Sequence, residues 1–262
     1  MSEVRTHGGE TQRSLPGRIA TDVVVAFQFL TRLPMPAVEF NTGSLARSAQ
    51  YFPLVGMAVG AGAVLVERLL AAHLERPLVA IATVIYLVAI TGCFHEDALA
   101  DLADSFGAWT RERRLEIMRD SRIGSYGAAA LVLALAARVA LLTYLPLGRF
   151  AAYVIAAHVL CRWSTLPLSY FIPPARVDNG QGAQVAGVTS RTTLAVGSAF
   201  TLAVVVGLLR WSAIAPIVLV VLVTAVSGWT YRRRLGGVTG DCFGATNQLS
   251  EIAVYLCGVW VL

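Results

Sequence analysis

The sequence predicts an all-α, polytopic integral membrane protein. We expect a helical bundle of about six or seven transmembrane helices, with a short interfacial or re-entrant segment near the N-terminus. The chain of 262 residues is 56% hydrophobic and has a mean hydropathy of +0.65. Only 14% of its residues are charged, whereas a soluble domain carries roughly a quarter. Apolar runs that approach the roughly 20 residues needed to cross a bilayer recur along the chain.

Six of these runs predict the spans in order. They lie near 53–73, 77–94, 126–147, 150–172, 193–209 and 211–231. A seventh run at 249–262 is short, so it would either span a locally thinned bilayer or lie at the interface.

The N-terminal region is expected to differ from the bundle. The apolar run 23–33 is too short to span and is stopped by Pro34 and Pro36, which favours an amphipathic or re-entrant piece. No cleavable signal peptide is expected, because no small-residue cleavage site follows this run. We therefore predict a polar cytoplasmic tail at 1–21 and a single transmembrane domain at 22–262.

The basic residues predict the orientation of the bundle. The chain contains 21 basic residues, all of them arginine, and a net charge of +5. Fifteen of these arginines lie in 1–51 and in the loops near 95–125, 173–192 and 232–248, which the positive-inside rule places in the cytoplasm. Arginines in short loops between apolar runs are typical of topology signals, so no nucleic acid partner is expected. The four cysteines are scattered singly, which argues against a disulfide framework or a zinc site.

An acidic segment at 94–104 is the most informative part of the chain. If it is helical, Asp97, Asp101 and Asp104 share one face at spacings of four and three residues. Three like charges on one stripe repel one another, and a hard divalent cation relieves that repulsion. The alternative is a solvated helix end with acids near its N-terminus. Because seven of the 16 acids lie between Glu96 and Asp120, we favour a magnesium and phosphate site.

A polar cluster follows at 119–124, just before the span near 126–147. Arg119 and Arg122 flank Ser121, and Gly124 provides a flexible turn. Two guanidinium groups beside such a turn suit a diphosphate or a nucleotide. The alternative is topology control with Glu–Arg helix pairs, which explains Arg111 and Arg113 well but explains this cluster poorly.

The third cluster runs from 236 to 251 and begins with several glycines, which would let backbone amides approach a ligand closely. Asp241 is expected in a loop, with Thr239 beside it. Asn247 and Glu251 would lie one helical turn apart at the start of the last apolar run. Polar groups at a membrane boundary are costly unless they are used.

Charged residues also interrupt the apolar runs themselves. Arg162 and His158 lie one turn apart, and either form a core pair or belong to the site. Arg138 either snorkels or pairs inside the bundle.

These clusters resemble the motifs of the cobalamin synthase family, the adenosylcobinamide-GDP ribazoletransferases. Residues 92–104 are similar to its motif G-x-x-H-x-D-G-L-A-D-x-x-D, and residues 116–124 to E-I-M-R-D-S-R-x-G. Residues 237–251 are similar to G-x-T-G-D-x-x-G-A-x-x-Q-L-S-E. The segments 29–34 and 52–56 also look like the family, so that the resemblance covers the chain from about residue 22 to its end.

The sequence departs from the family at Ala98, where glycine is usual. The methyl group of Ala98 could crowd a close backbone approach, although the neighbouring carboxylates are retained.

The resemblance implies that 22–262 is a catalytic domain in the bacterial cytoplasmic (inner) membrane, with its active-site loops on the cytoplasmic side. The implied reaction joins adenosylcobinamide-GDP to α-ribazole, or its 5′-phosphate, and releases GMP with adenosylcobalamin or its 5′-phosphate. Mg²⁺ is the implied cofactor. The lipid bilayer is a further partner, and both homo-oligomers and assemblies with other late cobalamin enzymes stay open.

The expected roles follow. Asp97, Asp101, Asp104 and Asp241 would hold magnesium, and His95, Asp97 and Asp120 would be catalytic, with His95 or Asp120 as the base. The expected substrate-binding residues are Arg119, Ser121, Arg122, Gly124, Arg162, Thr239, Asn247 and Glu251.

Two other functions compete with this interpretation. A different membrane phosphotransferase, acting on a phospho-alcohol and a nucleotide diphosphate, would share the acidic stripe but would not need the other two clusters. A transporter for an anionic solute would use Arg138 and Arg162 and would leave the loop acids without a role.

Overall fold

The computed structural model describes residues 15–38, 42–176 and 189–260, and in these ranges the chain is built from helices. In chain order they are α1 (Leu15–Leu30), α2 (Thr42–Ser48), η1 (Ala49–Tyr51), α3 (Phe52–Leu70), α4 (Arg76–Thr91), α5 (Phe94–Ser105), α6 (Arg111–Ile117), α7 (Ser125–Tyr144), α8 (Leu147–Trp163), α9 (Thr165–Phe171), α10 (Arg191–Leu209), η2 (Arg210–Ala213), α11 (Ile214–Arg234) and α12 (Gly240–Trp260). The described residues contain no named strand, in agreement with the predicted all-α class. A single isolated bridge joins Pro174 to Val238.

Helix starts follow ordinary local signals. Proline occupies the first turn of both α3 and α4, where its missing N–H is not needed. The side chain of Thr110 accepts a hydrogen bond from the backbone N–H of Arg113 and caps α6. Ser190 caps α10 in the same way through Thr193.

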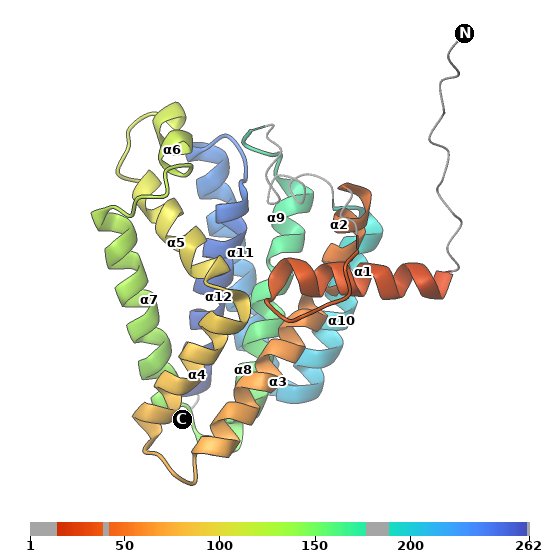
Figure 1. The fold of residues 1–262 in the computed structure, drawn as a ribbon, viewed down its shortest axis with the longest axis vertical. Helices are drawn as coiled ribbons and strands as arrows, with labels where there is room; N and C mark the ends of the chain where they lie inside the picture. The colour runs from red at the N-terminus through yellow and green to blue at the C-terminus, as the bar shows by residue number, and fades with distance from the viewer. Residues whose placement is uncertain (1–14, 39–41, 177–188, 261–262) are drawn as a thin grey trace.

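The centre of the bundle is formed by α8 and α12. Helix α8 packs against α3, α10 and α12, while α12 also packs against α5, α7 and α11 (Figure 1). Val154, Ala157 and Tyr255 are fully or almost fully buried in the resulting core.

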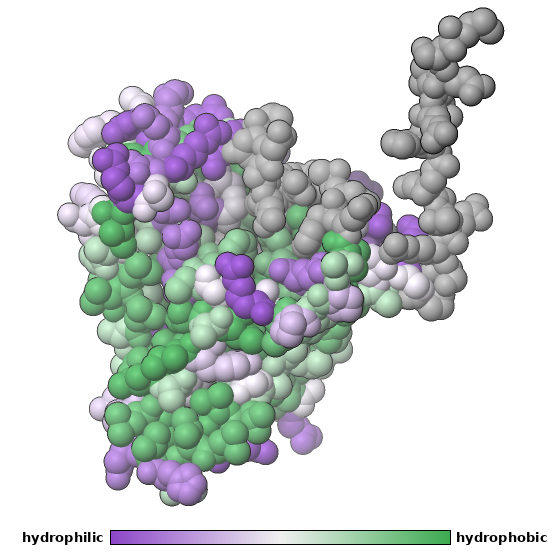
Figure 2. All heavy atoms as spheres, viewed as in Figure 1, coloured by the Kyte–Doolittle hydropathy of each residue, from purple (hydrophilic) through white to green (hydrophobic). Residues whose placement is uncertain are grey.

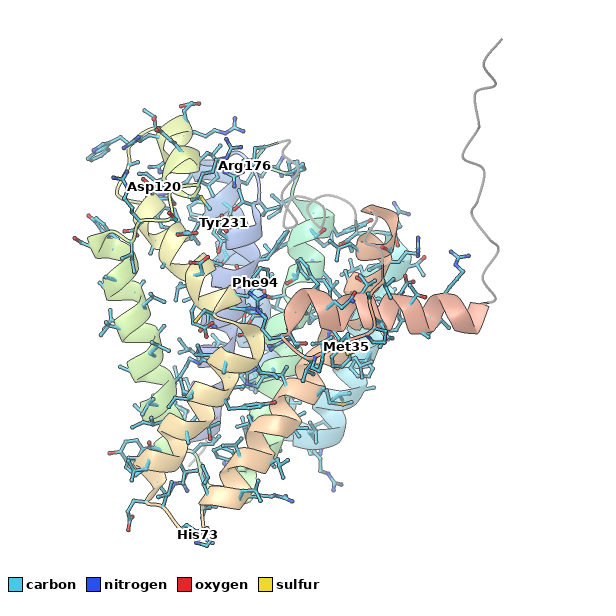
Figure 3. All side chains as sticks on the ribbon, viewed as in Figure 1. Met35, His73, Phe94, Asp120, Arg176 and Tyr231 are labelled. Atoms are coloured by element: carbon cyan, nitrogen blue, oxygen red, sulfur yellow. The ribbon has the colours of Figure 1, made fainter. Side chains whose placement is uncertain are left out.

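The two ends of the bundle differ in character. The hydrophilic residues gather over the end that carries α6, and hydrophobic residues cover much of the opposite part (Figure 2). Asp120 and Arg176 lie at the first end, and His73 in the α3–α4 connection lies at the other (Figure 3). The described parts of the arginine-rich loops near 95–125, 173–192 and 232–248 therefore lie at one end of the bundle, and the side of the membrane that this end faces stays a prediction.

Helix α1 crosses the bundle at a steep angle (Figure 1). Val25 and Ala26 in its second half are fully buried, while Ile19, nearer its start, is 45% exposed. It ends at Leu30, before the prolines, as predicted. It begins at Leu15, so the predicted boundary between 21 and 22 falls inside it, and residues 1–14 of the predicted tail lie outside the described ranges.

Three described stretches are long and apolar enough to cross a membrane: Gly43–Leu70, Ser125–Tyr144 and Arg191–Arg234. The bent pair α4 and α5 would make a fourth. Helices α8 and α12 carry buried polar side chains, which lowers their hydropathy, so the count of six or seven spans stays a prediction.

Three expected boundaries are corrected. The run 77–94 is not one span, because the chain bends by 88° between α4 and α5. Gly92 and Cys93 both adopt left-handed backbone conformations at this bend, with φ of 64° and 61°. The region 95–125 contains α5 and α6 and is not simply a loop. The last helix is not confined to 249–262 but starts at Gly240, with its polar first half inside the bundle.

Candidate active site

The acidic segment is helical, and its carboxylates meet a fourth one from α12. Asp97 and Asp101 lie on α5, and Asp241 lies in the first turn of α12, not in the predicted loop. Asp101 experiences electrostatic repulsion from Asp97, Asp241 and Asp104. The structure thus brings all four predicted metal ligands into one region.

Asp104 has a partner that the sequence did not indicate. Its Oδ2 accepts a hydrogen bond of 2.7 Å from the N–H of Gly124, and its Oδ1 accepts one of 2.8 Å from Gly127. Both oxygens therefore cap the N-terminus of α7, whose first N–H groups have no partner inside the helix. Gly124, predicted to bind substrate, here binds Asp104 through its backbone.

The other three carboxylates suit a hydrated magnesium ion. Among the described residues, only His158, Cys161 and Glu251 bring three ligand atoms within 4.8 Å of one another, so the carboxylates of α5 and Asp241 are more widely spaced. Magnesium keeps several waters and is held by one or two carboxylates together with substrate phosphates. The all-oxygen set of Asp97, Asp101 and Asp241, in which Asp101 is repelled by the other two, fits that requirement.

The arginine-bearing loop lies next to this cluster through the Gly124 contact. The guanidinium of Arg122 binds Asp120 through two nitrogens, with a shortest distance of 2.6 Å, and its side chain is 87% exposed. This contact holds the pKa of Asp120 at about 2. A carboxyl group with so low a pKa is a weak base, so the geometry favours Asp120 as the residue that orients Arg122. Arg119 and Ser121 are exposed on the same loop.

A small pocket lies below the acidic cluster and gathers three predicted residues from three helices. His95 comes from α5, Arg162 from α8 and Asn247 from α12, and all three line the pocket. Each is at most 3% exposed. The rest of the lining is mainly aromatic and apolar: Phe29, Leu30, Phe52, Phe94, Thr165, Gly240, Phe243 and Gly244.

These three polar residues each carry a buried atom without a hydrogen-bond partner among the described residues. The atoms are Nδ1 of His95, Nε of Arg162 and Oδ1 of Asn247. An unsatisfied buried donor or acceptor costs about 1–3 kcal/mol, and proteins concentrate such groups where a ligand supplies the partner. The pocket therefore has the character of a binding site.

Beneath the pocket, a network of buried charges joins α5, α7 and α12. Arg138 donates to Glu96 at 2.7 Å and to Glu251 at 2.9 Å, and also reaches Gln248 at 3.3 Å. Arg138 is 1% exposed, so it pairs inside the bundle, one of the two alternatives that the sequence left open. Glu251, predicted to bind substrate, is buried and accepts from Arg138, and its predicted role stays a prediction.

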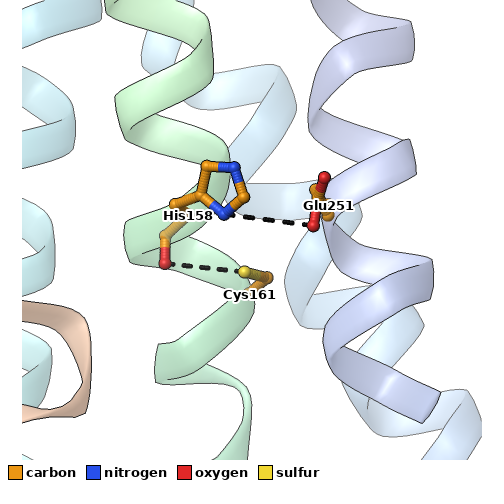
Figure 4. Close-up of side chains that lie close together, drawn as sticks. All are labelled: His158, Cys161 and Glu251. Carbon is orange, nitrogen blue, oxygen red and sulfur yellow. Dashed lines mark hydrogen bonds and ion pairs between the residues drawn. The ribbon is translucent and has the colours of Figure 1, made fainter. Parts of the chain in front are cut away.

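His158, Cys161 and Glu251 lie close together in the same region (Figure 4). Arg162 donates to Nδ1 of His158 at 3.0 Å, and because a guanidinium can only donate, Nε2 carries the hydrogen that faces Tyr255. The Nδ1 lone pair is thus in use, and Arg138 already pairs with Glu251. A hydrogen-bonded network explains this cluster better than a metal site.

Two glycines of the third cluster, Gly237 and Gly244, allow other parts of the chain to approach closely. At Gly237, an added Cβ would lie 2.4 Å from the carbonyl oxygen of Pro173. The next residue, Val238, donates its backbone N–H to Pro173 and accepts from the N–H of Ala175. At Gly244, an added Cβ would lie 2.4 Å from the Cβ of Ala98. Gly244 therefore makes room for the methyl group of Ala98. Thr239 is buried and lies 3.3 Å from Oδ2 of Asp241, to which its hydroxyl donates.

Sequence reasoning missed several residues of this region. Arg176 is the cation that acts on Asp241, and it also donates to the carbonyl of Leu115. Arg111 donates to the carbonyls of Leu235 and Ala175 and so ties α6 to the loop before α12. An arginine in a polar loop gives no sequence signal that separates such roles from topology control.

Comparisons with known proteins agree with the motifs. The family model described as "Cobalamin-5-phosphate synthase" matches residues 22–259. A protein of Azorhizobium caulinodans named adenosylcobinamide-GDP ribazoletransferase is 42% identical over 256 residues, covering 93% of this chain and 97% of the relative. Proteins with the same name from Ralstonia nicotianae and Mesorhizobium japonicum are 39% and 38% identical, covering 91% and 92% of this chain and 93% of each relative. No solved structure matches the chain. The chain belongs to the cobalamin-5-phosphate synthase family.

Proposed function

We propose that this protein joins adenosylcobinamide-GDP to α-ribazole, or its 5′-phosphate, to give adenosylcobalamin, or its 5′-phosphate, and GMP. The names of its relatives supply the reaction, and one observation about this chain carries it. The three motifs, far apart in sequence, meet along α5: its carboxylates interact with Asp241 of α12, Asp104 in its last turn binds Gly124 of the loop at 119–124, and His95 in its first turn lines the pocket. A reaction between two large phosphate-bearing substrates needs such a composite site.

The proposed chemistry is an in-line displacement at phosphorus. A ribose hydroxyl of α-ribazole attacks the phosphorus attached to cobinamide, the bond to the GMP oxygen breaks, and the hydroxyl proton passes to a base. Asp97, Asp101 and Asp241 would hold Mg²⁺, with Asp104 fixing the adjacent helix. Bound magnesium neutralises the charge that develops on the diphosphate.

The chain's own residues divide the remaining work. Arg122, oriented by Asp120, and Arg119 would contact phosphate oxygens from the exposed loop. His95 lines the pocket and precedes Asp97 by two residues on α5. Nδ1 of His95 has no hydrogen-bond partner among the described residues, whereas both oxygens of Asp120 bind Arg122, so we favour His95 over Asp120 as the base.

The site would face the cytoplasm of a bacterial inner membrane, since it lies at the arginine-rich end of the bundle. The transporter alternative is less well supported, because Arg138 is buried and paired with Glu96 and Glu251. The phospho-alcohol transferase alternative does not account for the pocket of His95, Arg162 and Asn247.

The test is turnover by the purified protein in lipid vesicles. Adenosylcobinamide-GDP and α-ribazole phosphate would be supplied with and without Mg²⁺, and GMP and the corrinoid product separated by chromatography. We expect both products in equal amounts, and only when both substrates and Mg²⁺ are present. GMP release without α-ribazole, or no turnover by inserted and folded protein, would overturn the proposal.

A further inference from the structure

The pocket beneath the acidic cluster has a shape and a lining that point to one kind of ligand. Its enclosed part has a volume of about 30 Å³, and the open space at its mouth brings the total to about 390 Å³, so a ligand would occupy the mouth as well as the enclosed part. Phe29 stacks on Phe52 with ring centroids 5.6 Å apart and meets Phe94 edge-on at 5.5 Å. Phe243 lines the pocket from α12. Flat aromatic surfaces of this kind favour a planar ring system.

The polar atoms of the pocket are few and specific. Arg162 Nε offers a donor, Asn247 Oδ1 an acceptor and His95 Nδ1 either, and all three are buried without a partner among the described residues. A ligand here would therefore be largely apolar and would present a small number of hydrogen-bonding groups.

The pocket adjoins the proposed reaction centre on two sides. On α5, His95 of the lining is two residues from Asp97. On α12, Gly240 of the lining is followed directly by Asp241. A nucleoside whose base occupies the pocket would therefore place its ribose beside the carboxylates.

We infer that this pocket binds the benzimidazole base of α-ribazole, so that Phe29, Phe94 and Phe243 determine specificity for the nucleophilic substrate. This inference rests on the proposed function. The base is planar, bicyclic and methyl-bearing, and has one free ring nitrogen, which can accept from Nε of Arg162. The ribose hydroxyls can use Asn247 and His95. Guanine presents five polar positions along its edges, and the mainly apolar lining offers too few partners for them.

The experiment compares Michaelis constants for the two substrates in vesicle-reconstituted protein. Phe94→Leu keeps apolar volume but removes a ring from the mouth of the pocket, where Phe94 is 38% exposed. Losing an aromatic contact corresponds to roughly a 3- to 10-fold change, so we expect the KM for α-ribazole phosphate to rise by that factor. The KM for adenosylcobinamide-GDP should stay within about twofold. Phe29→Leu is a second variant with the same expectation.

Phe171→Leu is the matched control, because Phe171 is 67% exposed on α9 and lies outside the pocket lining. It should leave both constants unchanged. A rise only in the KM for adenosylcobinamide-GDP would assign the pocket to the guanine base and overturn the inference. Unchanged constants in both Phe94→Leu and Phe29→Leu would show that the aromatic cluster serves packing alone.

Binding without turnover separates this inference from the proposed function. Equilibrium dialysis of wild-type vesicles would compare labelled α-ribazole with labelled guanosine, each without the second substrate. We expect α-ribazole to bind and Phe94→Leu to weaken that binding. If wild type binds α-ribazole but shows no turnover, the proposed reaction fails and the pocket assignment stands. Binding of guanosine in preference to α-ribazole would overturn the assignment whatever the turnover.

Discussion

The carboxylate of Asp104, in the last turn of α5, accepts a hydrogen bond of 2.7 Å from the backbone N–H of Gly124, the residue before α7. Its other oxygen accepts the N–H of Gly127. A side chain from one helix thereby caps the start of another, and the cap anchors the loop that carries Arg122. Asp104 thus positions this loop, whereas our proposal assigns cation binding to Asp97 and Asp101.

These two roles predict opposite effects on stability. Asp104→Asn should cost about 1–2 kcal/mol, because an amide replaces one of the two accepting oxygens with a donor. Asp101→Asn removes a charge that Asp97, Asp104 and Asp241 repel, so it should leave the unfolding temperature unchanged or raise it while turnover falls steeply. Thermal unfolding in detergent without Mg²⁺ measures the difference. Equal stability of the two variants would show that Asp104 acts as a metal ligand like Asp97 and Asp101, and not as a helix cap.

Asp97→Asn tests the metal site directly. Turnover should fall by about 10²–10³-fold, the scale for losing one group that stabilises charge in the transition state. The concentration of Mg²⁺ needed for half-maximal rate should rise as well, because a ligand charge is lost. Magnesium titrations of wild type, Asp97→Asn and Asp101→Asn are the measurement. A normal magnesium dependence in both variants would mean that α5 is merely a charged helix end.

Arg122 and Arg113 form a matched pair of exposed arginines. Arg122 binds Asp120 at 2.6 Å and Arg113 binds Glu116 at 2.7 Å. Arg122→Lys keeps the charge but loses the planar fork, so turnover should fall by about tenfold or more. Arg113→Lys should stay within about twofold of wild type, as expected for a surface pair. Similar kinetic constants for the two variants would show that the loop contributes only positive charge and does not bind phosphate specifically.

Asp120 should influence rate without influencing the pH profile. Its pKa of about 2 means that it is fully deprotonated from pH 5 upward, so it has no proton to gain or lose across the assay range. Asp120→Asn should lower turnover by releasing Arg122, and the acid limb of the profile should remain where it is in wild type. If the acid limb disappears in this variant, Asp120 is the base and His95 is not.

Topology can be tested by cysteine labelling at two well-separated sites. Cys93 is the one native cysteine that is exposed, so Cys93→Ser provides the background. Trp109→Cys replaces a side chain that is 94% exposed at the α6 end. At Gly148 an added side chain meets no atom within 4 Å. In right-side-out vesicles, a membrane-impermeant maleimide should label position 148 and not 109. The reverse pattern would invert the orientation.

The sequence alone determined the class of the protein and most of its candidate residues. Inside a bilayer, a long apolar run pairs all of its backbone N–H and C=O groups within itself by forming a helix, so composition predicts the all-α membrane bundle. The spacing of Asp97, Asp101 and Asp104 is a local property of one helix, and α5 has the predicted face. The stop before Pro34 is local as well, and α1 ends at Leu30.

Only the tertiary structure decided which partner each polar residue has. Glu251 and Arg138 are 113 residues apart and meet because α12 packs on α7, so Glu251 is used inside the bundle. Asp104 meets Gly124 because α5 and α7 pack together. Asp97 and Asp104 look alike in sequence, since both are acids on one stripe. Their roles separate only when other helices supply an amide donor to one and a second carboxylate to the other, and no local pattern encodes those long-range contacts.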